Sequence, residues 1–314
     1  MSQAEFSHAP VMLDQVIRHL DINPDGIYVD GTYGRGGHAR SILKKLGNNG
    51  RLIVMDKDPQ AVDAARLAIG EDARVTICHD DYAHMAQMLA EMDMKHRVDG
   101  VLLDLGVSSP QLDDANRGFS FQNNGPLDMR MNPMQGESAA EWLRHAGEKE
   151  ISTVLWELGE ERFARRIARK IVETRQLQDI EDTRTLSDLI SGCVPQAKHK
   201  KHPATRSFQA IRIHINQELT CIGRLLDSIF EVLKIGGRLL VISFHSLEDR
   251  LVKRFFRLHS TRPKIPRGLP VRDKDLLSHI RLRLIGKAIK AGAQELSLNP
   301  RARSAVLRVA ERIS

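Results

Sequence analysis

A buried strand that runs into a glycine-rich turn and then into a helix is the feature that most constrains the fold of this chain. The segment reads Tyr28-Val29-Asp30-Gly31-Thr32-Tyr33-Gly34-Arg35-Gly36-Gly37-His38, and a helix is expected from Ala39 to Leu46. In open α/β sheets, nucleotide-like ligands bind at such a turn, beyond the carboxyl end of the strand. Glycine lacks a Cβ atom, so the backbone can approach a ligand closely. Taken alone, the segment also fits an ordinary strand–helix turn.

Four near-continuous apolar strands are predicted in the first part of the chain, and each leads to a polar side chain. After the strand that ends at Asp30, strands are expected at 51–56, 74–78 and 98–103. Apolar strands separated by helical segments predict a parallel sheet covered by helices on both faces. The carboxyl ends of parallel strands meet at one edge of the sheet. We therefore expect four side chains to lie at that edge: Asp30, Asp56, Tyr82 and Asp104.

Two classes of cofactor fit this edge, NAD and S-adenosylmethionine. Asp56, about 20 residues after the glycine turn, can bind both hydroxyls of a ribose in either cofactor. A dinucleotide site usually carries G-x-G-x-x-G, and the glycines after Asp30 do not match that spacing. The Asp30 carboxylate would repel a pyrophosphate, whereas it would attract the sulfonium and ammonium groups of S-adenosylmethionine. These residues therefore favour S-adenosylmethionine.

Six longer motifs follow one another along the chain. They are LLDLGVSSPQLD (102–113), RGFSF (117–121), GPLDMRM (125–131), KHPATR (201–206), ISFHSLEDR (242–250) and NPRARS (299–304). With the glycine turn, they resemble the RsmH (MraW) family of bacterial 16S rRNA cytosine-N4 methyltransferases. The resemblance spans nearly the whole chain and is looser at 60–97 and 260–298. It implies methylation of the exocyclic N4 of a cytidine in the decoding region of 16S rRNA, on the small ribosomal subunit.

The resemblance also implies roles for individual residues. A cofactor site is expected from seven of them: Gly36, Gly37 and His38 at the methionine end, Asp56 at the ribose, Tyr82 near the adenine, and Asp104 and Gln111 completing the pocket. Amino-methyltransferases commonly carry a short polar–Pro segment after the fourth strand, and Ser108-Ser109-Pro110 resembles it, so we expect contacts to the target amine there. No Cys follows Pro110, which argues against the covalent route of cytosine-C5 enzymes. No general base is assigned.

The chain changes character after residue 112. Residues 113–130 show no clear period, helices such as the one expected at 160–175 follow, and sheet character returns only at 236–244. A long amphipathic helix is predicted from Ile213 to Lys234, ended by Gly236-Gly237.

These changes predict an insertion. We expect a Rossmann-like class I S-adenosylmethionine-dependent methyltransferase sheet with an inserted α-helical domain. The methyltransferase domain would comprise residues 1–112 and 218–314, and the inserted substrate-recognition domain residues 113–217. Edge strands are expected at 280–285 and 304–310, including an antiparallel one. A tandem of two domains fits less well, because the first four strands would lack a fifth.

The net charge of +7 is unevenly distributed. Residues 250–290 contain 13 Lys and Arg against 2 Asp and Glu, and residues 161–214 contain 12 against 6. Basic surfaces beside an acidic cofactor pocket are typical of an enzyme that acts on a polyanion. Solvated helix faces are the alternative explanation.

The loop at 198–206 is the most basic short segment of the inserted region. Phosphate contacts are predicted for four of its side chains: Lys198, Lys200, Lys201 and Arg206. His199 and His202 are poor candidates for a metal site, since three neighbouring positive charges disfavour a cation. We expect no metal in this protein.

Composition points to a cytoplasmic protein. The three cysteines are widely spaced and form no C-x-x-C pair, as expected for reduced thiols. No apolar run approaches the ~20 residues that span a bilayer, and no signal segment is recognisable. The sequence does not decide the oligomeric state. Three other functions stay open: a DNA amino-methyltransferase, a small-molecule methyltransferase, and a non-catalytic RNA-binding protein.

Overall fold

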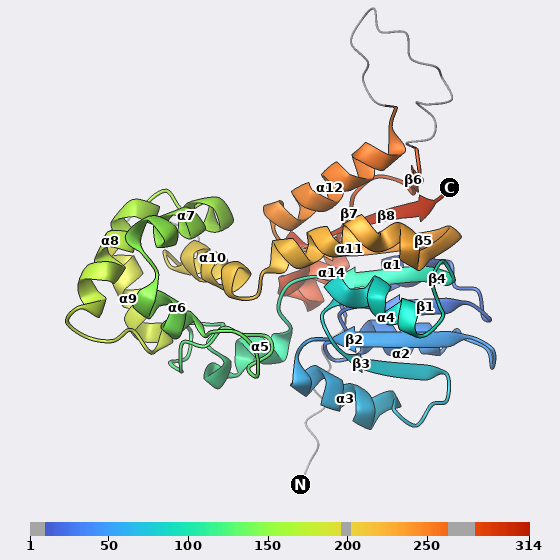
Figure 1. Cartoon of the computed structure of the whole chain (residues 1–314), viewed down its shortest axis with the longest axis horizontal. Helices are drawn as coiled ribbons and strands as arrows, with labels where there is room; N and C mark the ends of the chain where they lie inside the picture. The colour runs from blue at the N-terminus through green and yellow to red at the C-terminus, as the bar shows by residue number, and fades with distance from the viewer. Residues whose placement is uncertain (1–9, 196–201, 263–279) are drawn as a thin grey trace, which may run out of the picture. The chain divides into compact units, whose positions relative to one another are not determined.

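The computed structural model describes residues 10–195, 202–262 and 280–314 and divides the chain into two compact units (Figure 1). We call residues 1–106 together with 219–314 the sheet unit, and residues 107–218 the helical unit. The boundaries predicted from the sequence lie after residues 112 and 217, whereas the units divide after Gly106 and Glu218.

The sheet unit is built on a sheet with the strand order β3-β2-β1-β4-β5-β8-β6, and β7 pairs with β8. The strands are β1 (Ile27–Asp30), β2 (Arg51–Asp56), β3 (Val75–His79), β4 (Val98–Asp104), β5 (Leu233–Ser243), β6 (Leu282–Leu284), β7 (Ile289–Lys290) and β8 (Val306–Arg312). Strands β1 to β5 run parallel, and β8 runs antiparallel to both β5 and β6. The predicted Rossmann-like sheet with an antiparallel edge region is therefore confirmed.

Alternate residues of the central strands point to opposite faces of the sheet. Val29, Ile53 and Leu103 belong to one buried cluster, and their neighbours on the same strands, such as Tyr28 and Leu52, belong to another. Helices α4 (Met85–Glu91), α11 (Glu218–Val232) and α12 (Ser246–Ser260) contribute to the first cluster. Helices α1 (Leu13–Leu20), α2 (Gly37–Leu43) and α3 (Pro59–Ile69) contribute to the second.

The remaining described elements of the sheet unit are η1 (Tyr82–His84), α14 (Ala293–Leu298) and η3 (Pro300–Ser304). Because both faces are covered, the strands read as continuous apolar runs, and their carboxyl ends are the places where polar side chains can gather.

The helical unit has its own core. Its elements are α5 (Ser109–Asp113), η2 (Ala115–Arg117), α6 (Ala139–His145), α7 (Glu148–Gly159), α8 (Ala164–Arg175), α9 (Thr183–Cys193) and α10 (Thr205–Ile215). Trp142, Ile167 and Ile211 are buried in one cluster whose members all lie within this unit. In the part of the chain that the structure describes, no helix is long and apolar enough to cross a membrane.

The single helix predicted from Ile213 to Lys234 is wrong. Helix α10 ends at Ile215, and α11 begins at Glu218. Between them Gln217 takes a φ of 49°, which interrupts the helix. The side chain of Asn216 accepts a hydrogen bond from Met131 N and donates one to the Met129 carbonyl, both at 2.7 Å. These contacts, distant in sequence, hold the break in place.

Two other local predictions need correction. Gly236-Gly237 does not cap a helix but lies within β5, where the pairing with β4 shifts register and Gly236 has a φ of +83°. Glycine allows this conformation because it has no Cβ atom. The helix predicted from 160 begins instead at Ala164, since Glu160 ends α7 with a φ of 49°.

Candidate functional site

Three carboxyl groups lie where neighbouring strands end. Asp30, Asp56 and Asp104 are the last residues of β1, β2 and β4, which are adjacent in the order β2-β1-β4. Burial raises the pKa of Asp30 to about 7, that of Asp56 to about 6 and that of Asp104 to about 8. Mutual repulsion adds to burial, because Asp56 raises the pKa of Asp30, and Asp30 that of Asp104. A cationic ligand at this edge would favour their ionised forms.

Asp104 is the most unusual of the three. Its side chain keeps 25% of its surface exposed, yet its Oδ1 atom is buried and has no hydrogen-bond partner among the described residues. Its backbone N–H donates to the hydroxyl of Thr32 at 2.6 Å, which ties the end of β4 to the glycine turn. A buried oxygen without a partner is costly, so this atom fits a site for a positively charged or hydrogen-bonding ligand.

Asp56 is held rigidly by backbone donors. Its Oδ2 accepts from Gly34 N and its Oδ1 from Asp58 N, both at 2.9 Å. Each carboxylate oxygen retains a second lone pair, which is the acceptor geometry that a pair of ribose hydroxyls needs. The structure thus brings Asp56, the last residue of β2, together with the glycine turn after β1.

The glycine turn requires glycine at two of the predicted positions. Gly36 has a φ of +70°, and a Cβ atom there would lie 2.3 Å from the Tyr33 hydroxyl. A Cβ atom on Gly37, the first residue of α2, would lie 2.8 Å from Pro10 Cγ. The Tyr33 hydroxyl is buried beside this turn, near the guanidinium of Arg40. Close packing against Tyr33 and Pro10 therefore accounts for these two glycines.

His38 is a neutral, buried imidazole. It is 5% exposed, its Nε2 donates to the Val11 carbonyl at 2.9 Å, and burial lowers its pKa to about 4. Its Nδ1 lies 3.8 Å from Asp104 Oδ2. The structure therefore brings the predicted residues His38 and Asp104 close together, with an imidazole acceptor facing the carboxyl group.

Tyr82 is positioned by the loop after β3. It opens η1, whose first turn is capped by Asp81 through a 2.9 Å bond from Ala83 N. A Cβ atom on Gly31 would lie 3.3 Å from Tyr82 Cβ, so Tyr82 packs directly against the backbone after β1. Because Gly31 directly follows Asp30, this packing places Tyr82 at the same edge of the sheet as Asp30, as predicted.

An ion pair next to two predicted residues was missed by the sequence analysis. Lys57, which follows Asp56, places Nζ 3.0 Å from Asp81 Oδ2, and Asp81 precedes Tyr82. The Cys221 thiol donates to the same oxygen at 3.2 Å, and burial and Asp81 raise the pKa of Cys221 to about 12. This cluster joins the loops after β2 and β3. The sequence could have indicated this ion pair, because Lys57 directly follows Asp56 and Asp81 directly precedes Tyr82.

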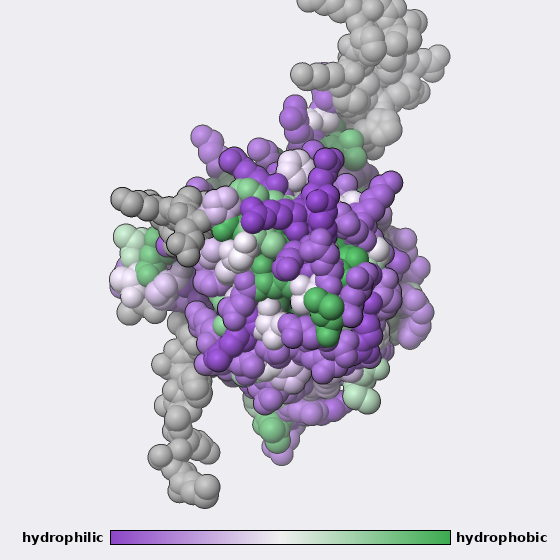
Figure 2. Space-filling model, turned by 90° about the vertical axis from the view of Figure 1, so that its left-hand side faces the viewer, coloured by the Kyte–Doolittle hydropathy of each residue, from purple (hydrophilic) through white to green (hydrophobic). Residues whose placement is uncertain are grey.

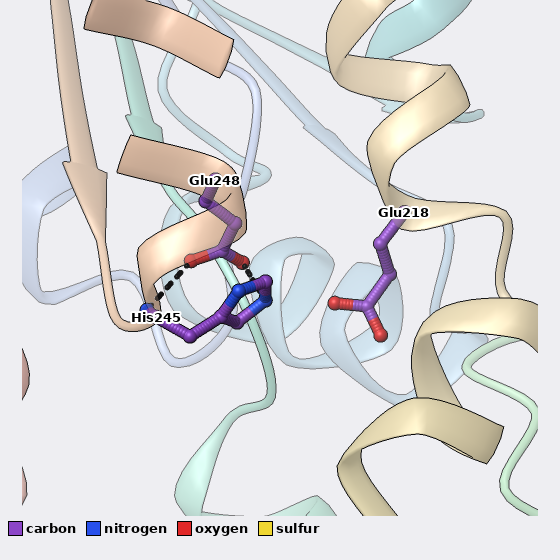
Figure 3. A group of neighbouring side chains, drawn as sticks. All are labelled: Glu218, His245 and Glu248. Atoms are coloured by element: carbon purple, nitrogen blue, oxygen red, sulfur yellow. Dashed lines mark hydrogen bonds and ion pairs between the residues drawn. The ribbon is translucent and has the colours of Figure 1, made fainter. Parts of the chain in front are cut away.

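A second missed group follows β5, within the motif ISFHSLEDR. Glu248 is 1% exposed, and its Oε2 accepts from the backbone N–H groups of Phe244 at 2.8 Å and His245 at 3.2 Å. Its Oε1 lies 3.1 Å from His245 Nε2 (Figure 3). Figure 3 also draws Glu218, whose carboxylate pairs with Arg212 of the helical unit at 2.7 and 2.8 Å.

The predicted residues Ser108, Ser109, Pro110 and Gln111 lie in the helical unit, at the start of α5. Ser108 is the N-cap, and Gln111 Oε1 accepts from Ser108 N at 2.8 Å in a capping box. Gln111 is 5% exposed. The local geometry explains why a polar–Pro segment begins this short helix, since Pro is favoured in a first helical turn. Contacts of these residues with cofactor or target amine stay predictions.

Of the four predicted phosphate-binding side chains, Lys198, Lys200 and Lys201 lie outside the described residues, as does His199. Arg206 is exposed near the start of α10, and its guanidinium donates to the Glu160 carbonyl at 3.1 Å. The His202 ring packs on Phe121 with a centroid distance of 4.5 Å. His202 therefore has an aromatic contact within the helical unit.

Comparison with known proteins decides the family. The model of the MraW methylase family matches residues 5–313. This chain belongs to the MraW methylase family. The ribosomal RNA small subunit methyltransferase H of Thioalkalivibrio sulfidiphilus is 56% identical over 308 residues, covering 98% of each chain. That of Coxiella burnetii (strain Dugway 5J108-111) is 54% identical, covering 98% of this chain and 99% of the relative.

Membership of the MraW methylase family confirms the resemblance, the enzyme class and the S-adenosylmethionine-dependent methyltransferase fold expected from the sequence. A solved structure of an rRNA methylase from Streptococcus thermophilus is 11% identical, covers 96% of this chain and 94% of its own, and has a TM-score of 0.38. A similarity this low adds nothing to the assignment. This family member carries three carboxyl groups at the ends of the adjacent strands β1, β2 and β4.

Proposed function

We propose that this protein transfers a methyl group from S-adenosylmethionine to the exocyclic N4 of a cytidine in the decoding region of 16S rRNA, with the small ribosomal subunit as substrate. The substrate rests on the family, whose relatives in two organisms are named ribosomal RNA small subunit methyltransferase H. The observation that carries the chemistry is the set of carboxyl groups at the ends of the adjacent strands β1, β2 and β4, whose ionised forms a cationic ligand would favour.

Within the sheet unit, six predicted residues form the proposed cofactor site: Gly36, Gly37, His38, Asp56, Tyr82 and Asp104. Asp56 would accept from the ribose hydroxyls, because its two oxygens are oriented by Gly34 and Asp58. Asp104 would bind the cationic end, and the neutral His38 beside it would accept a hydrogen bond rather than repel the charge. Gln111 is proposed as a further cofactor contact, and Ser108-Ser109-Pro110 as contacts to the target amine.

Positioning would supply much of the rate. The N4 lone pair of cytosine is delocalised into the ring, so the amine is a weak nucleophile. The bound methyl donor supplies a methyl group already activated by the positive charge on sulfur. Holding the amine in line with that methyl group can contribute up to about 7–11 kcal/mol for well-oriented reactants. The residues of this chain therefore need to hold the cytosine amine and the methyl donor in line with each other.

The helical unit carries the proposed RNA-binding surface. Five basic side chains of α8 and the turn before it are exposed: Arg162, Arg165, Arg166, Arg169 and Lys170. Figure 2 faces this unit and shows a largely hydrophilic surface with a smaller hydrophobic area. Together with Lys198, Lys200, Lys201 and Arg206, these side chains would bind phosphates in a salt-dependent manner. A structured target base must also be splayed out, at a cost of a few kcal/mol.

The test is methyl transfer with tritiated S-adenosylmethionine. Small subunits from cells that lack the gene are compared with naked 16S rRNA, tRNA and duplex DNA, followed by digestion to nucleosides. We expect label in N4-methylcytidine from the small-subunit RNA. Label only in another nucleic acid would overturn the substrate and keep the methyltransferase. Absence of both transfer and calorimetric cofactor binding would overturn the proposed function.

A further inference from the structure

Buried polar atoms without hydrogen-bond partners gather at the ends of β4 and β5 in the sheet unit. Among the described residues, Asp104 Oδ1 and Ser243 Oγ are buried and make no hydrogen bond, and the ring nitrogens of His245 are also buried, with Nε2 3.1 Å from Glu248 Oε1. Asp104 ends β4 and pairs with Ile242, which immediately precedes Ser243 at the end of β5. All three residues therefore lie at the edge that carries the proposed cofactor site. Such atoms are costly to bury, so a ligand at this edge is the economical explanation.

His245 is the member of this group best suited to exchange a proton. Its side chain is 10% exposed, and the residue is the N-cap of α12, separated from the end of β5 by Phe244 alone. Glu248 Oε1 lies 3.1 Å from His245 Nε2, within reach of a hydrogen bond that would orient the ring. Glu248 also lies near enough to Asp104 to raise the pKa of that carboxyl group. The imidazole is thus within the electrostatic surroundings of the cofactor site.

Glu248 is suited to orient the His245 ring rather than to take part in the reaction itself. Its Oε2 accepts from the backbone N–H groups of Phe244 and His245, and its side chain is almost fully buried. This fixes the carboxylate beside the imidazole ring (Figure 3). An imidazole held by a fixed carboxylate is a common arrangement for a general base.

Building on the proposed function, we infer that His245 accepts the proton that leaves the target amine, and that Glu248 is its positioning residue. The N4 lone pair forms the new N–C bond while the C–S bond breaks and its electron pair stays on sulfur. The N4 nitrogen, now positively charged, releases one proton to a ring nitrogen of His245. The imidazolium formed is stabilised by the Glu248 carboxylate and passes its proton to solvent. Because alkylation makes the amine strongly acidic, an imidazole is basic enough for this step.

The first test uses His245→Ala and Glu248→Gln in the full-length protein, with methyl transfer to unmodified small subunits. We expect His245→Ala to lower kcat by about 10²-fold, at the lower end of general acid–base effects, with KM for the subunit little changed. Added imidazole should restore a substantial part of the rate, in proportion to its unprotonated form. Glu248→Gln should lower kcat less and should gain nothing from imidazole.

A matched control is His145→Gln. His145 also faces a carboxylate, with Nε2 2.6 Å from Glu137, but it is 63% exposed on α6. This variant should keep the wild-type rate. If His245→Ala retains wild-type kcat, or if its loss is not rescued by imidazole although calorimetry shows unchanged cofactor binding, the inference is overturned. Failure of the proposed function is distinct, because the wild-type protein would then transfer no label.

A second measurement does not depend on turnover. In ¹⁵N-histidine-labelled protein saturated with S-adenosylhomocysteine, cytidine is added and the ring signals are followed by NMR. The signal absent from a His245→Asn variant should shift on addition of cytidine, and the His145 signal should stay unchanged. An unperturbed His245 signal at saturating cytidine would contradict a position beside the target base.

Discussion

At the residue scale, the carboxyl group of Asp104 has a raised pKa of about 8 because it is surrounded by protein and faces other acids. Asp30 and Asp56 share this property, with pKa values of about 7 and 6. Each group must ionise at some cost in the ligand-free protein, and a cation would remove that cost. At neutral pH these groups therefore lower the stability of the ligand-free protein relative to fully solvated carboxyl groups.

The raised pKa values of these three groups make the stability of the folded protein depend on pH, in a direction that can be worked out. The folded pKa values exceed the ordinary value of 3.8, so the folded state binds more protons than the unfolded state between about pH 4 and about pH 8. The contribution of these groups to stability is therefore present at low pH and is lost as pH rises through 6 to 8. Asp104→Asn should raise the Tm of the ligand-free protein at pH 8 by about 2–4 °C for each kcal/mol gained.

Calorimetric unfolding at pH 5 and pH 8 measures this effect. Asp63→Asn, at an exposed position of α3, is the control and should show no comparable difference between the two pH values. A Tm for Asp104→Asn below that of the wild type at pH 8 would show that ionised Asp104 is stabilised by the protein itself.

Asp56 is expected to matter for binding as well as for the local fold, because its oxygens also accept from Gly34 N and Asp58 N. Asp56→Ala removes two charged acceptors, and hydrogen bonds to charged groups are worth about 1.5–3 kcal/mol each. Affinity for S-adenosylmethionine should fall by at least about tenfold, measured by titration calorimetry. Unchanged affinity in a variant that is folded by circular dichroism would rule out the ribose role.

At the element scale, helix α12 follows the end of β5 and carries a basic surface along its length. Arg250, Lys253, Arg254 and Arg257 are exposed and recur with a spacing of three or four residues, so they lie on one stripe of the helix. The helix begins beside His245 at the carboxyl end of β5. The stripe therefore begins about one turn into the helix and runs along its axis, as a binding surface for a phosphate backbone would.

Charge reversal on this stripe should weaken binding to RNA. Lys253→Glu combined with Arg254→Glu should lower the affinity for small subunits and reduce the slope of log K against log salt by about one per lost phosphate contact. Filter binding at several salt concentrations measures both. Arg66→Glu, on α3, is the control. An unchanged slope would mean that α12 does not contact the RNA backbone.

Helix α11 contains a glycine in its interior, Gly223, which lowers the stability of the helix relative to alanine. A Cβ atom added at Gly223 would meet no neighbouring heavy atom within 4 Å, and this glycine has no positive φ. Gly223→Ala should therefore raise the free energy of unfolding by about 0.5–1 kcal/mol. Urea denaturation measures this change, and Gly36→Ala, whose Cβ would lie 2.3 Å from the Tyr33 hydroxyl, should change stability in the opposite direction.

At the scale of the whole molecule, the helical unit has a core drawn from its own residues, whereas the buried clusters of the sheet unit combine both of its chain segments. A fragment of residues 107–218 should therefore unfold cooperatively on heating, followed by circular dichroism. A fragment of residues 1–106 should not, because it lacks β5, the neighbour of β4. A non-cooperative transition for 107–218 would show that its core is insufficient.

The sequence predicted the sheet well because period and polarity are local. The strands at 51–56 and 98–103 and the acids at their ends follow from apolar runs that finish on a polar residue. The break at Asn216 could not be predicted, because it depends on contacts with Met129 and Met131 in a distant segment. His245 belongs to the motif at 242–250, but the sequence alone assigns it no role, since its buried ring nitrogens become visible only in the folded chain.

The insertion also determines the order in which the protein can assemble during synthesis. Strand β5 pairs with β4, yet the whole helical unit is translated between them. The first four strands therefore leave the ribosome with one edge of β4 unpaired, while the helical unit, with its own core, can fold before the sheet is complete. Pairing between strands so distant in sequence is slow, and an unpaired strand edge invites aggregation. The carboxyl ends of β4 and β5, where the proposed site lies, are thus among the last parts of the newly made chain to form.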